Sequence, residues 1–279
     1  MAERPIPSPS QATVADPTVL VTGAASGIGA AVVDALREVG IRVLCLDRDA
    51  QALAAAGDTG DGRIPLVADV TEEAEVEAAL DDPAARADSL VGLVHCAGIS
   101  RVGPAMELSV EVVREVLDVN VVGSFVVARA VARRLERAGR PGRIVLLGSI
   151  NSRIALPGQA AYATSKGAVL LLAQTLAVEW ASVDIAVNVL GPGPTATPLV
   201  AASMADPDRW AALLARSPTR RATAPEEVAS LARFLVLEVP TQVTGAYLPI
   251  DGGWLASGGG YLDLAARPAG PPSGEQQVR

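Results

Sequence analysis

A glycine-rich turn between a short apolar run and a helical pattern constrains this chain most. Residues 18–22, Thr-Val-Leu-Val-Thr, have the length and composition of a buried strand. The turn at 22–29, Thr-Gly-Ala-Ala-Ser-Gly-Ile-Gly, follows at once and opens a helical pattern that Gly40 closes. Backbone N–H groups of such a turn can approach a pyrophosphate at the positive end of the helix. Because both flanks match, we favour phosphate binding over a turn that needs glycine for packing alone.

Apolar runs alternate with helical patterns along most of the chain. This alternation predicts an α/β fold, a Rossmann-like doubly wound parallel sheet of about seven strands with helices on both faces. Sites in such sheets lie at the carboxyl ends of the strands. Further strands are expected at 41–46, 63–68, 90–95, 143–147 and 184–190, and helices at 71–80, 111–137 and from Tyr162 to about Trp180.

Composition excludes several classes of function. The net charge of -8 without a basic stripe argues against nucleic acid as a partner, and no apolar run is long enough for a membrane span. Cys45 and Cys96 lie in apolar runs, so we expect buried thiols in a reducing, cytoplasmic compartment. A single histidine with two cysteines does not predict a metal site.

Asp47 ends the second strand, 18 residues after Gly29. In dinucleotide-binding folds an acid about 20 residues after the turn accepts the adenosine ribose hydroxyls. Because a carboxylate there repels a 2′-phosphate, we expect NAD rather than NADP, and residues 24–26 add no positive charge. Two alternatives stay open: Arg48 is placed to reach a phosphate, and Asp47 fits the N-cap of the next helix.

Tyr162 and Lys166 lie four residues apart, which places them on one face of a helix. A free phenol has a pKa of about 10, and a nearby ammonium favours the phenolate, so the pair can move a proton to or from a hydroxyl or carbonyl oxygen. Such pairs also occur on helix surfaces without a function. However, Lys166 is the only lysine of the chain. Arg replaces a compact ammonium poorly, so we interpret the lone lysine as a functional mark.

Three further polar residues are candidates. Asn120 lies in an apolar helical pattern and needs a hydrogen-bond partner. Ser149 follows the fifth strand and precedes Tyr162 by 13 residues. His95 ends the fourth strand, and no nucleophile motif accompanies it, so we expect a strand-end residue near the ligand rather than a catalytic base.

Together these residues resemble the short-chain dehydrogenase/reductase family in its single-domain form. Residues 22–29 are similar to its Thr-Gly-x-x-x-Gly-x-Gly turn, and 95–98 resemble its Asn-Asn-Ala-Gly segment with both Asn replaced. Asn120, Ser149, Tyr162 and Lys166 match the catalytic four of the family in order and spacing. The resemblance spans about residues 17–255, and the expected domain is a single dinucleotide-binding catalytic domain at 17–257, between disordered tails at 1–16 and 258–279. The first tail lacks the apolar segment of a signal peptide.

The resemblance implies a role for each residue of the site. Tyr162 is the general acid/base, Ser149 stabilises the substrate oxygen, and Lys166 lowers the phenol pKa and holds the nicotinamide ribose. Asn120 is expected to hold a water between Lys166 and solvent, with a helix-kink hydrogen bond as the alternative. The implied cofactor-binding residues are Gly23, Ser26, Gly27, Ile28, Gly29, Asp47, Arg48, Asp69, Val70, Ala97, Gly98, Asn120, Tyr162, Lys166, Pro192, Gly193, Thr195 and Thr197.

The implied function is NAD-dependent interconversion of a secondary alcohol and a ketone by hydride transfer. Residues 99–103, 150–156 and 195–218 predict a largely apolar substrate pocket. Two alternatives stay open: an NADPH-dependent 3-oxoacyl reductase of the carrier-protein type, and a non-catalytic nucleotide-sensing protein with this fold. The family also implies a homotetramer or homodimer, and the widely apolar helix 111–137 agrees with burial against another copy.

Overall fold

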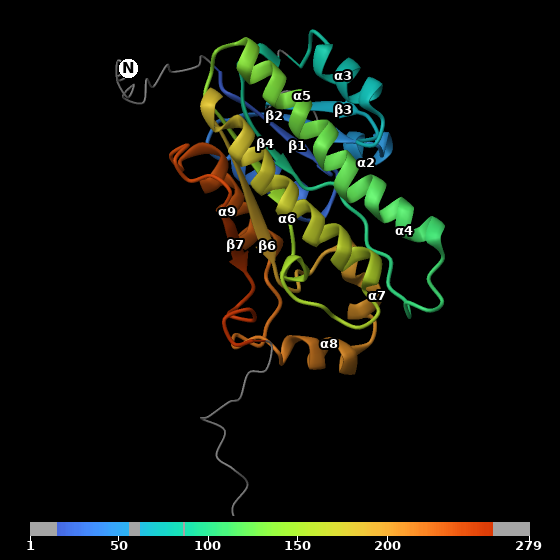
Figure 1. Cartoon of the computed structure of the whole chain (residues 1–279). Helices are drawn as coiled ribbons and strands as arrows, with labels where there is room; N and C mark the ends of the chain where they lie inside the picture. Colours follow the sequence, from blue (N-terminus) through green and yellow to red (C-terminus); the bar gives the residue numbers. More distant parts are fainter. Residues whose placement is uncertain (1–15, 56–61, 86, 259–279) are drawn as a thin grey trace, which may run out of the picture.

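A single parallel sheet organises the protein. The structure, a computed structural model, describes residues 16–55, 62–85 and 87–258. Within these ranges seven strands pair in the order β3-β2-β1-β4-β5-β6-β7 (Figure 1), which confirms the expected fold class. The strands are β1 (Thr18–Thr22), β2 (Arg42–Asp47), β3 (Arg63–Val67), β4 (Leu90–His95), β5 (Gly142–Leu147), β6 (Ile185–Pro192) and β7 (Tyr247–Ile250). Apart from Asp16 and Gly258, the expected tails lie outside the described residues, so the domain bounds stay a prediction.

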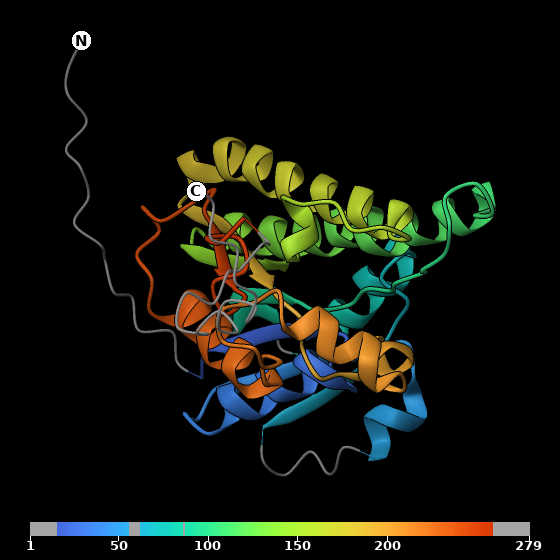
Figure 2. The ribbon, with the colours of Figure 1, turned by 90° about the horizontal axis from the view of Figure 1, so that it is seen from below.

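Helices cover both faces of the sheet, as the two layers in Figure 2 show. Successive residues of a strand point to opposite faces, so the nearly continuous apolar strands supply both cores. In β1, Leu20 belongs to one core, whereas Val19 and Val21 belong to the other. The first core lies under α3 (Glu73–Asp81), α5 (Gly123–Arg137) and α6 (Ala160–Trp180), and the second under α1 (Gly27–Arg37), α2 (Ala50–Ala55) and α9 (Pro225–Leu237).

The helix expected at 111–137 has a wide turn in its middle. α4 (Val110–Leu117) continues into α5 through a π-helical segment, Asp118–Val122. Asn120 lies in this segment and is completely buried. The Ser124 hydroxyl donates to the Asn120 carbonyl oxygen at 2.6 Å. A π turn inserts one extra residue into the helix, and such turns occur often at functional sites.

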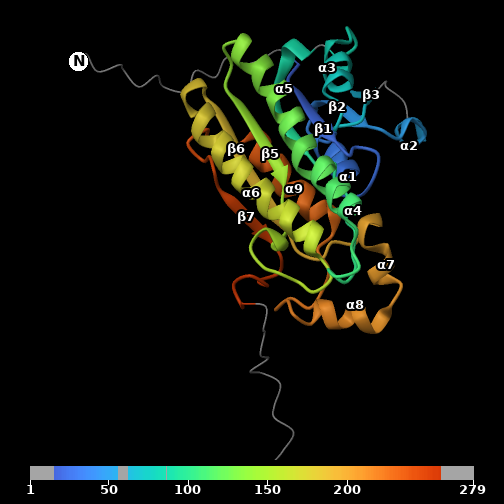
Figure 3. The same ribbon diagram turned by 45° about the vertical axis from the view of Figure 1, so that its right-hand side comes forward.

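The segment after β6 closes the carboxyl end of the sheet. It contains a 3₁₀ turn (Pro198–Val200), α7 (Ala201–Met204) and α8 (Pro207–Leu214), and the two helices lie together at one end of the molecule (Figures 1 and 3). β6 runs two residues beyond the expected end at 190, because Gly191 and Pro192 pair with β7. None of the helices in the described ranges is both long and apolar enough to cross a membrane.

Candidate active site

The glycine-rich turn connects β1 to α1 and packs directly against the segment that follows β4. Gly23 has a φ of +63°, which favours glycine. A Cβ added at Gly23 would lie 2.8 Å from the backbone nitrogen of Ala97, and one added at Gly29 would lie 2.0 Å from the Gly23 carbonyl oxygen. These distances leave no room for a side chain, so the turn holds its shape only with glycine at both positions.

The N-terminus of α1 is suited to bind an anion. Ser26 occupies the N-cap without a side-chain hydrogen bond to the first-turn amides, and the first turn contains no acidic residue. Gly27, Ile28 and Gly29 line a cavity at this end of the helix. Because the positive end of α1 faces the cavity, the turn fits the pyrophosphate of a dinucleotide, as the sequence predicts.

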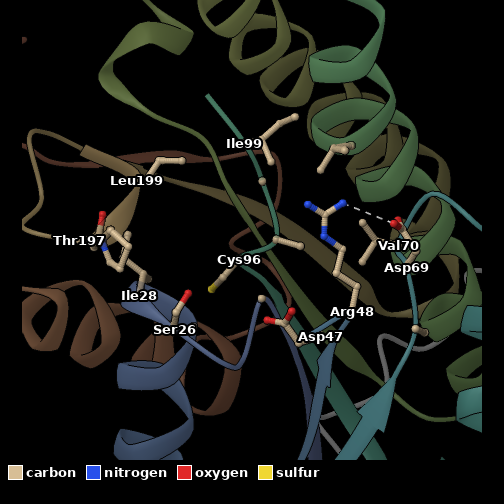
Figure 4. Close-up of a pocket in the computed structure, with 18 residues that line it drawn as sticks. Ser26, Ile28, Asp47, Arg48, Asp69, Val70, Cys96, Ile99, Thr197 and Leu199 are labelled. Carbon is tan, nitrogen blue, oxygen red and sulfur yellow. Dashed lines mark ion pairs between the residues drawn. The ribbon is translucent and has the colours of Figure 1, made fainter. Parts of the chain in front are cut away.

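Two aspartates and an arginine line the same cavity at its other end (Figure 4). Asp47 accepts hydrogen bonds from the backbone N–H groups of Ala25 and Asp49, both at 3.1 Å, so it ties the glycine turn to the end of β2. Arg48 reaches across the cavity to Asp69, with 3.6 Å between Nη1 and Oδ2 (Figure 4). Asp47 retains lone pairs for ribose hydroxyls, while Arg48 stands beside it as the residue able to bind a phosphate.

The pKa of Asp69 lies below its ordinary value. Burial tends to raise this pKa. The backbone and hydroxyl hydrogen bonds from Thr71, together with the charge of Arg48, lower it by a larger amount, so the net shift is downward. The carboxylate therefore stays ionised beside Arg48. Val70, the next residue, is buried and lines the cavity, where an adenine ring needs an apolar wall.

His95 lies beneath the cavity rather than in it. The Thr22 hydroxyl and His95 Nδ1 are 2.9 Å apart, and the Ala97 N–H donates to the same hydroxyl at 3.2 Å. Burial and the charge of Lys166 lower the His95 pKa to about 3, so the ring is neutral at ordinary pH. These contacts describe a strand-end residue that supports Ala97 and Gly98 at the cavity wall.

Asn120 joins three parts of the chain. Its Oδ1 accepts from the Ile99 N–H at 2.8 Å, and its Nδ2 donates to the Ile99 carbonyl oxygen and to Ser165 Oγ, both at 2.9 Å. These side-chain bonds connect the π segment to residue 99 and to α6. Asn120 lines neither cavity of the site and lies behind Gly98, where an added Cβ would be 3.1 Å from its Oδ1.

Ser149, Tyr162 and Lys166 converge on a second cavity. Ser149 follows β5, and Tyr162 and Lys166 share one face of α6, with Lys166 Nζ 5.7 Å from the centre of the Tyr162 ring. Lys166 is buried and donates to the Leu147 carbonyl oxygen at 2.7 Å. This arrangement places a hydroxyl, a phenol and an amine around one space, which suits proton transfer to or from an oxygen atom.

The pKa values of the pair differ in part from the sequence-based expectation. Burial raises the pKa of Tyr162, and its hydrogen bond with Ser149 only partly offsets this effect. Burial also lowers the pKa of Lys166 to about 8, against a smaller opposing effect of Cys96. Burial disfavours the charged form of both groups, so the net shift of the phenol pKa is upward in this structure, and the expected effect of Lys166 on it stays a prediction.

The loop after β6 completes both cavities. The first contains Gly23, Ser26, Gly27, Ile28, Gly29, Asp47, Arg48, Asp69, Val70, Ala97, Gly98 and Thr197. The second contains Gly98, Ser149, Tyr162, Lys166, Pro192, Gly193, Thr195 and Thr197. Because Ile28, Cys96, Gly98, Thr197 and Leu199 line both, the cavities adjoin. Apart from Asn120, every residue of the expected site lines one of them.

Gln159 and Tyr247 were not assigned to the site from the sequence, and Asn151 was expected there only as part of the pocket wall 150–156. Asn151 and Gln159 line the second cavity, and their side chains are hydrogen-bonded to each other. Tyr247 donates its hydroxyl to the Ser149 carbonyl oxygen at 2.8 Å from the neighbouring end of β7. Gln159 lies three residues before Tyr162, which is the one local signal for any of them. The described part of the chain contains no cluster of three or more His, Cys, Asp or Glu residues suited to a metal.

The fold and the two adjoining cavities define a dinucleotide-binding protein of the Rossmann type with a proton-transfer site. A model of the family described as enoyl-(acyl carrier protein) reductase matches residues 23–255. D-threitol dehydrogenase of Mycolicibacterium smegmatis is 39% identical over 240 residues, 84% of this chain and 91% of that protein. Galactitol 2-dehydrogenase (L-tagatose-forming) of Cereibacter sphaeroides is 38% identical, covering 84% of this chain and 93% of its own.

Solved structures agree with these matches. A gluconate 5-dehydrogenase from Burkholderia cenocepacia J2315, in complex with NADP and tartrate, has a TM-score of 0.81 and 34% identity over 86% of this chain and 95% of that one. The chain belongs to the short-chain dehydrogenase/reductase family, and it is an oxidoreductase that interconverts a secondary alcohol and a ketone with a nicotinamide dinucleotide. The resemblance inferred from the sequence is thereby confirmed.

Proposed function

We propose that this protein is an NAD-dependent dehydrogenase of a small secondary alcohol, with Tyr162 as its general acid/base. The observation that carries the proposal is the convergence of Ser149, Tyr162 and Lys166 on a cavity that adjoins the glycine turn. A dinucleotide whose pyrophosphate lies at α1 would extend toward this cavity. Two relatives whose names specify the oxidation of threitol and galactitol support an alcohol as the substrate.

Each residue has a stated part in oxidation. Tyr162 takes the hydroxyl proton, and Ser149 donates a hydrogen bond to the substrate oxygen. When bound, NAD supplies the acceptor for the hydride. Lys166, with a pKa of about 8, holds the ribose and returns the Tyr162 proton toward solvent through a water near Asn120. Asn120 also fixes residue 99 against α6.

The preference for NAD rests on Asp47. Its carboxylate lines the first cavity near the glycine turn, where it would repel a 2′-phosphate. Arg48 and the NADP bound by a solved relative favour a second candidate, an NADPH-dependent reductase of an oxo substrate such as a 3-oxoacyl group. We favour NAD over NADP because the Asp47 side chain is fixed by two backbone N–H groups, whereas the side chain of Arg48 is 64% exposed.

The proposal includes a homotetramer in a reducing cytoplasm. Leu171 and Val178 of α6 are 65% and 80% exposed and lie seven residues apart, so they form one apolar face on the described chain. Burial against a second copy would remove this face from water. The thiols of Cys45 and Cys96 are both free, which supports a reducing compartment.

The test is reduction of NAD and of NADP by the purified protein across a panel of secondary alcohols, with Tyr162→Phe measured in parallel. We expect turnover with NAD and a loss of at least about a hundredfold in kcat for the variant, because the phenol proton acceptor is removed. Turnover with NADP alone would contradict the role of Asp47 and favour the reductase. Dinucleotide binding without turnover of any substrate would favour a nucleotide-sensing protein.

A further inference from the structure

Tyr247 reaches from the last strand of the sheet to Ser149. In the sheet register Tyr247 pairs with Val189 of β6, and its ring lies over Gly191, two residues further along β6 and on the same face. A Cβ added at Gly191 would be 2.1 Å from the Tyr247 hydroxyl oxygen, so this contact requires glycine there. The Tyr247 hydroxyl donates to the Ser149 carbonyl oxygen at 2.8 Å.

The segment after β5 contacts Tyr247 at a second point. The Arg153 guanidinium lies 4.6 Å from the centre of the Tyr247 ring, close enough for cation–π attraction. Burial and the charge of Asp251 raise the pKa of Tyr247 to about 12, against a smaller opposing effect of Arg153. The hydroxyl therefore stays protonated over the ordinary range of pH and remains a hydrogen-bond donor.

Both backbone polar groups of Ser149 have hydroxyl partners. Its N–H donates to Ser152 Oγ at 3.2 Å, and the Ser152 hydroxyl donates to the Lys166 carbonyl oxygen at 2.8 Å. The Ser149 carbonyl oxygen accepts from the Ser152 N–H at 2.9 Å as well as from Tyr247. Ser152 thus ties Ser149 to α6, and Tyr247 ties it to β7. Because the peptide planes on both sides of the Ser149 Cα are held, the direction of its side chain is fixed.

The Ser149 hydroxyl depends on this direction for its own contacts. Its Oγ accepts from the Asn151 N–H at 3.2 Å, and its hydrogen bond with Tyr162 lowers the pKa of that phenol against the larger effect of burial. A rotation of Ser149 would weaken these bonds, because hydrogen bonds depend strongly on angle. Tyr247 lines neither cavity, so its hydroxyl acts through Ser149 and not on the substrate directly.

We infer that Tyr247 is a positioning residue for the reaction: its hydroxyl holds Ser149 in the orientation in which Oγ contacts both Tyr162 and the substrate oxygen. This inference rests on the proposed role of Ser149 and adds a residue outside both cavities to the site. Without the Tyr247 hydroxyl, the Ser149 carbonyl oxygen keeps the Ser152 N–H as a partner, so no buried acceptor is left unpaired. The hydroxyl therefore contributes more to the geometry of the site than to stability.

The experiment is a double-mutant cycle of Tyr247→Phe and Ser149→Ala. Turnover is measured with NAD and with NADP on butan-2-ol, cyclohexanol, 1-phenylethanol and threitol, and the best pair is used for all proteins. Phenylalanine keeps the ring over Gly191 and removes only the hydroxyl. We expect Tyr247→Phe to lower kcat about tenfold, because a small displacement at the reacting oxygen slows the reaction. In the Ser149→Ala background the same substitution should change kcat by no more than about twofold, because the group that Tyr247 positions is absent.

Two further measurements distinguish positioning from a purely structural role. The KM for the dinucleotide and the urea midpoint of unfolding should stay near their wild-type values in Tyr247→Phe. A weaker hydrogen bond from Ser149 also lets the pKa of Tyr162 rise further. Oxidation needs Tyr162 as a proton acceptor, so the increase of kcat with pH should move to higher pH by about half a unit.

Thr241→Val is the matched control, since it removes a hydroxyl that bonds Asp184 at 3.5 Å outside both cavities, and it should keep the wild-type kcat. An unchanged kcat in Tyr247→Phe, or an equal loss with and without the Ser149 hydroxyl, would overturn the inference and leave the role of Ser149 intact. An unchanged kcat in Ser149→Ala would overturn that role and the inference with it. Absence of turnover for every alcohol would overturn the proposed function as well.

Discussion

At the scale of single residues, His95 determines part of the response of this protein to acid. It is the only histidine of the chain, it is 2% exposed, and its Nε2 is buried without a hydrogen-bond partner in the described ranges. Burial lowers its pKa from 6.5 to about 3. Between these two values the unfolded chain binds a proton that the folded protein excludes, so the free energy of unfolding falls as the pH falls through this window.

We predict that His95→Asn removes this component. Asparagine is neutral and can keep a hydrogen bond to Thr22. Between pH 7 and pH 5 the wild-type protein should lose about 2 kcal/mol more stability than the variant, at about 1.4 kcal/mol for each unit of pKa difference. Urea unfolding at the two pH values measures the difference, and the carboxylates common to both proteins cancel. Parallel losses in the two proteins would contradict a neutral, buried His95.

Lys166 acts on stability at the opposite end of the pH range. Its pKa is lowered from 10.5 to about 8, so the unfolded chain binds more protons between these values and the wild-type stability rises with pH. Relative to Lys166→Met, the wild-type protein should gain about 1 kcal/mol between pH 7 and pH 9. Thermal or urea unfolding of both proteins at the two pH values tests this. A constant difference would show that the buried amine keeps its ordinary pKa.

At the scale of elements, the proposed preference for NAD rests on the end of β2. We predict that Asp47→Asn lowers the ratio of kcat/KM with NAD to that with NADP at least about tenfold, because the repulsion of a 2′-phosphate is removed while the side-chain shape is kept. Asp49→Asn is the matched control. Asp49 lies two residues further on, outside the cavity, where its carboxylate accepts from the Ala52 N–H at 2.9 Å. An equal effect of both variants would point to general charge rather than to Asp47.

The hydrogen bonds of Asn120 stabilise the π segment between α4 and α5 against the neighbouring chain. Asn120→Ala leaves the N–H and the carbonyl of Ile99 without partners, and it also removes a bond to Ser165. We expect a loss of about 3 kcal/mol in the free energy of unfolding, from about 1–3 kcal/mol for each buried group left unpaired. Ser165→Ala removes one of these bonds and should cost less. Urea titration of the three proteins gives the order, and equal stability of Asn120→Ala and wild type would contradict it.

At the scale of the whole molecule, the apolar face of α6 predicts assembly. Light scattering coupled to size exclusion should give about four times the chain mass of 28.4 kDa. Leu171→Glu places a charge at the centre of the proposed contact and should reduce this mass, because an unpaired charge is costly to bury. A wild-type protein that elutes at the mass of one chain would contradict the proposed tetramer.

Much of the fold could be predicted from the sequence. The apolar runs gave the strands β1 to β6 within one or two residues, since burial of a strand on both faces leaves a continuous local pattern. No ranges were predicted for β7 and α9, and the helix expected at 111–137 differs in its middle. Valines surround Asn120 on every side of the helix, so the periodicity contained no sign of the π turn. Within that turn, Asn120 bonds Ile99 and Ser165, which are distant in sequence.

Sequence by itself determined the features that arise within one segment: the order of strands and helices, the glycine turn, and the shared face of Tyr162 and Lys166. Backbone geometry links such residues directly. Only the tertiary structure decided which side chains meet across segments: the Arg48–Asp69 pair, the support of Ser149 by Tyr247, and the amides of Asn151 and Gln159. These contacts depend on how the sheet and helices pack. The same packing buries Tyr162 and thereby raises its pKa.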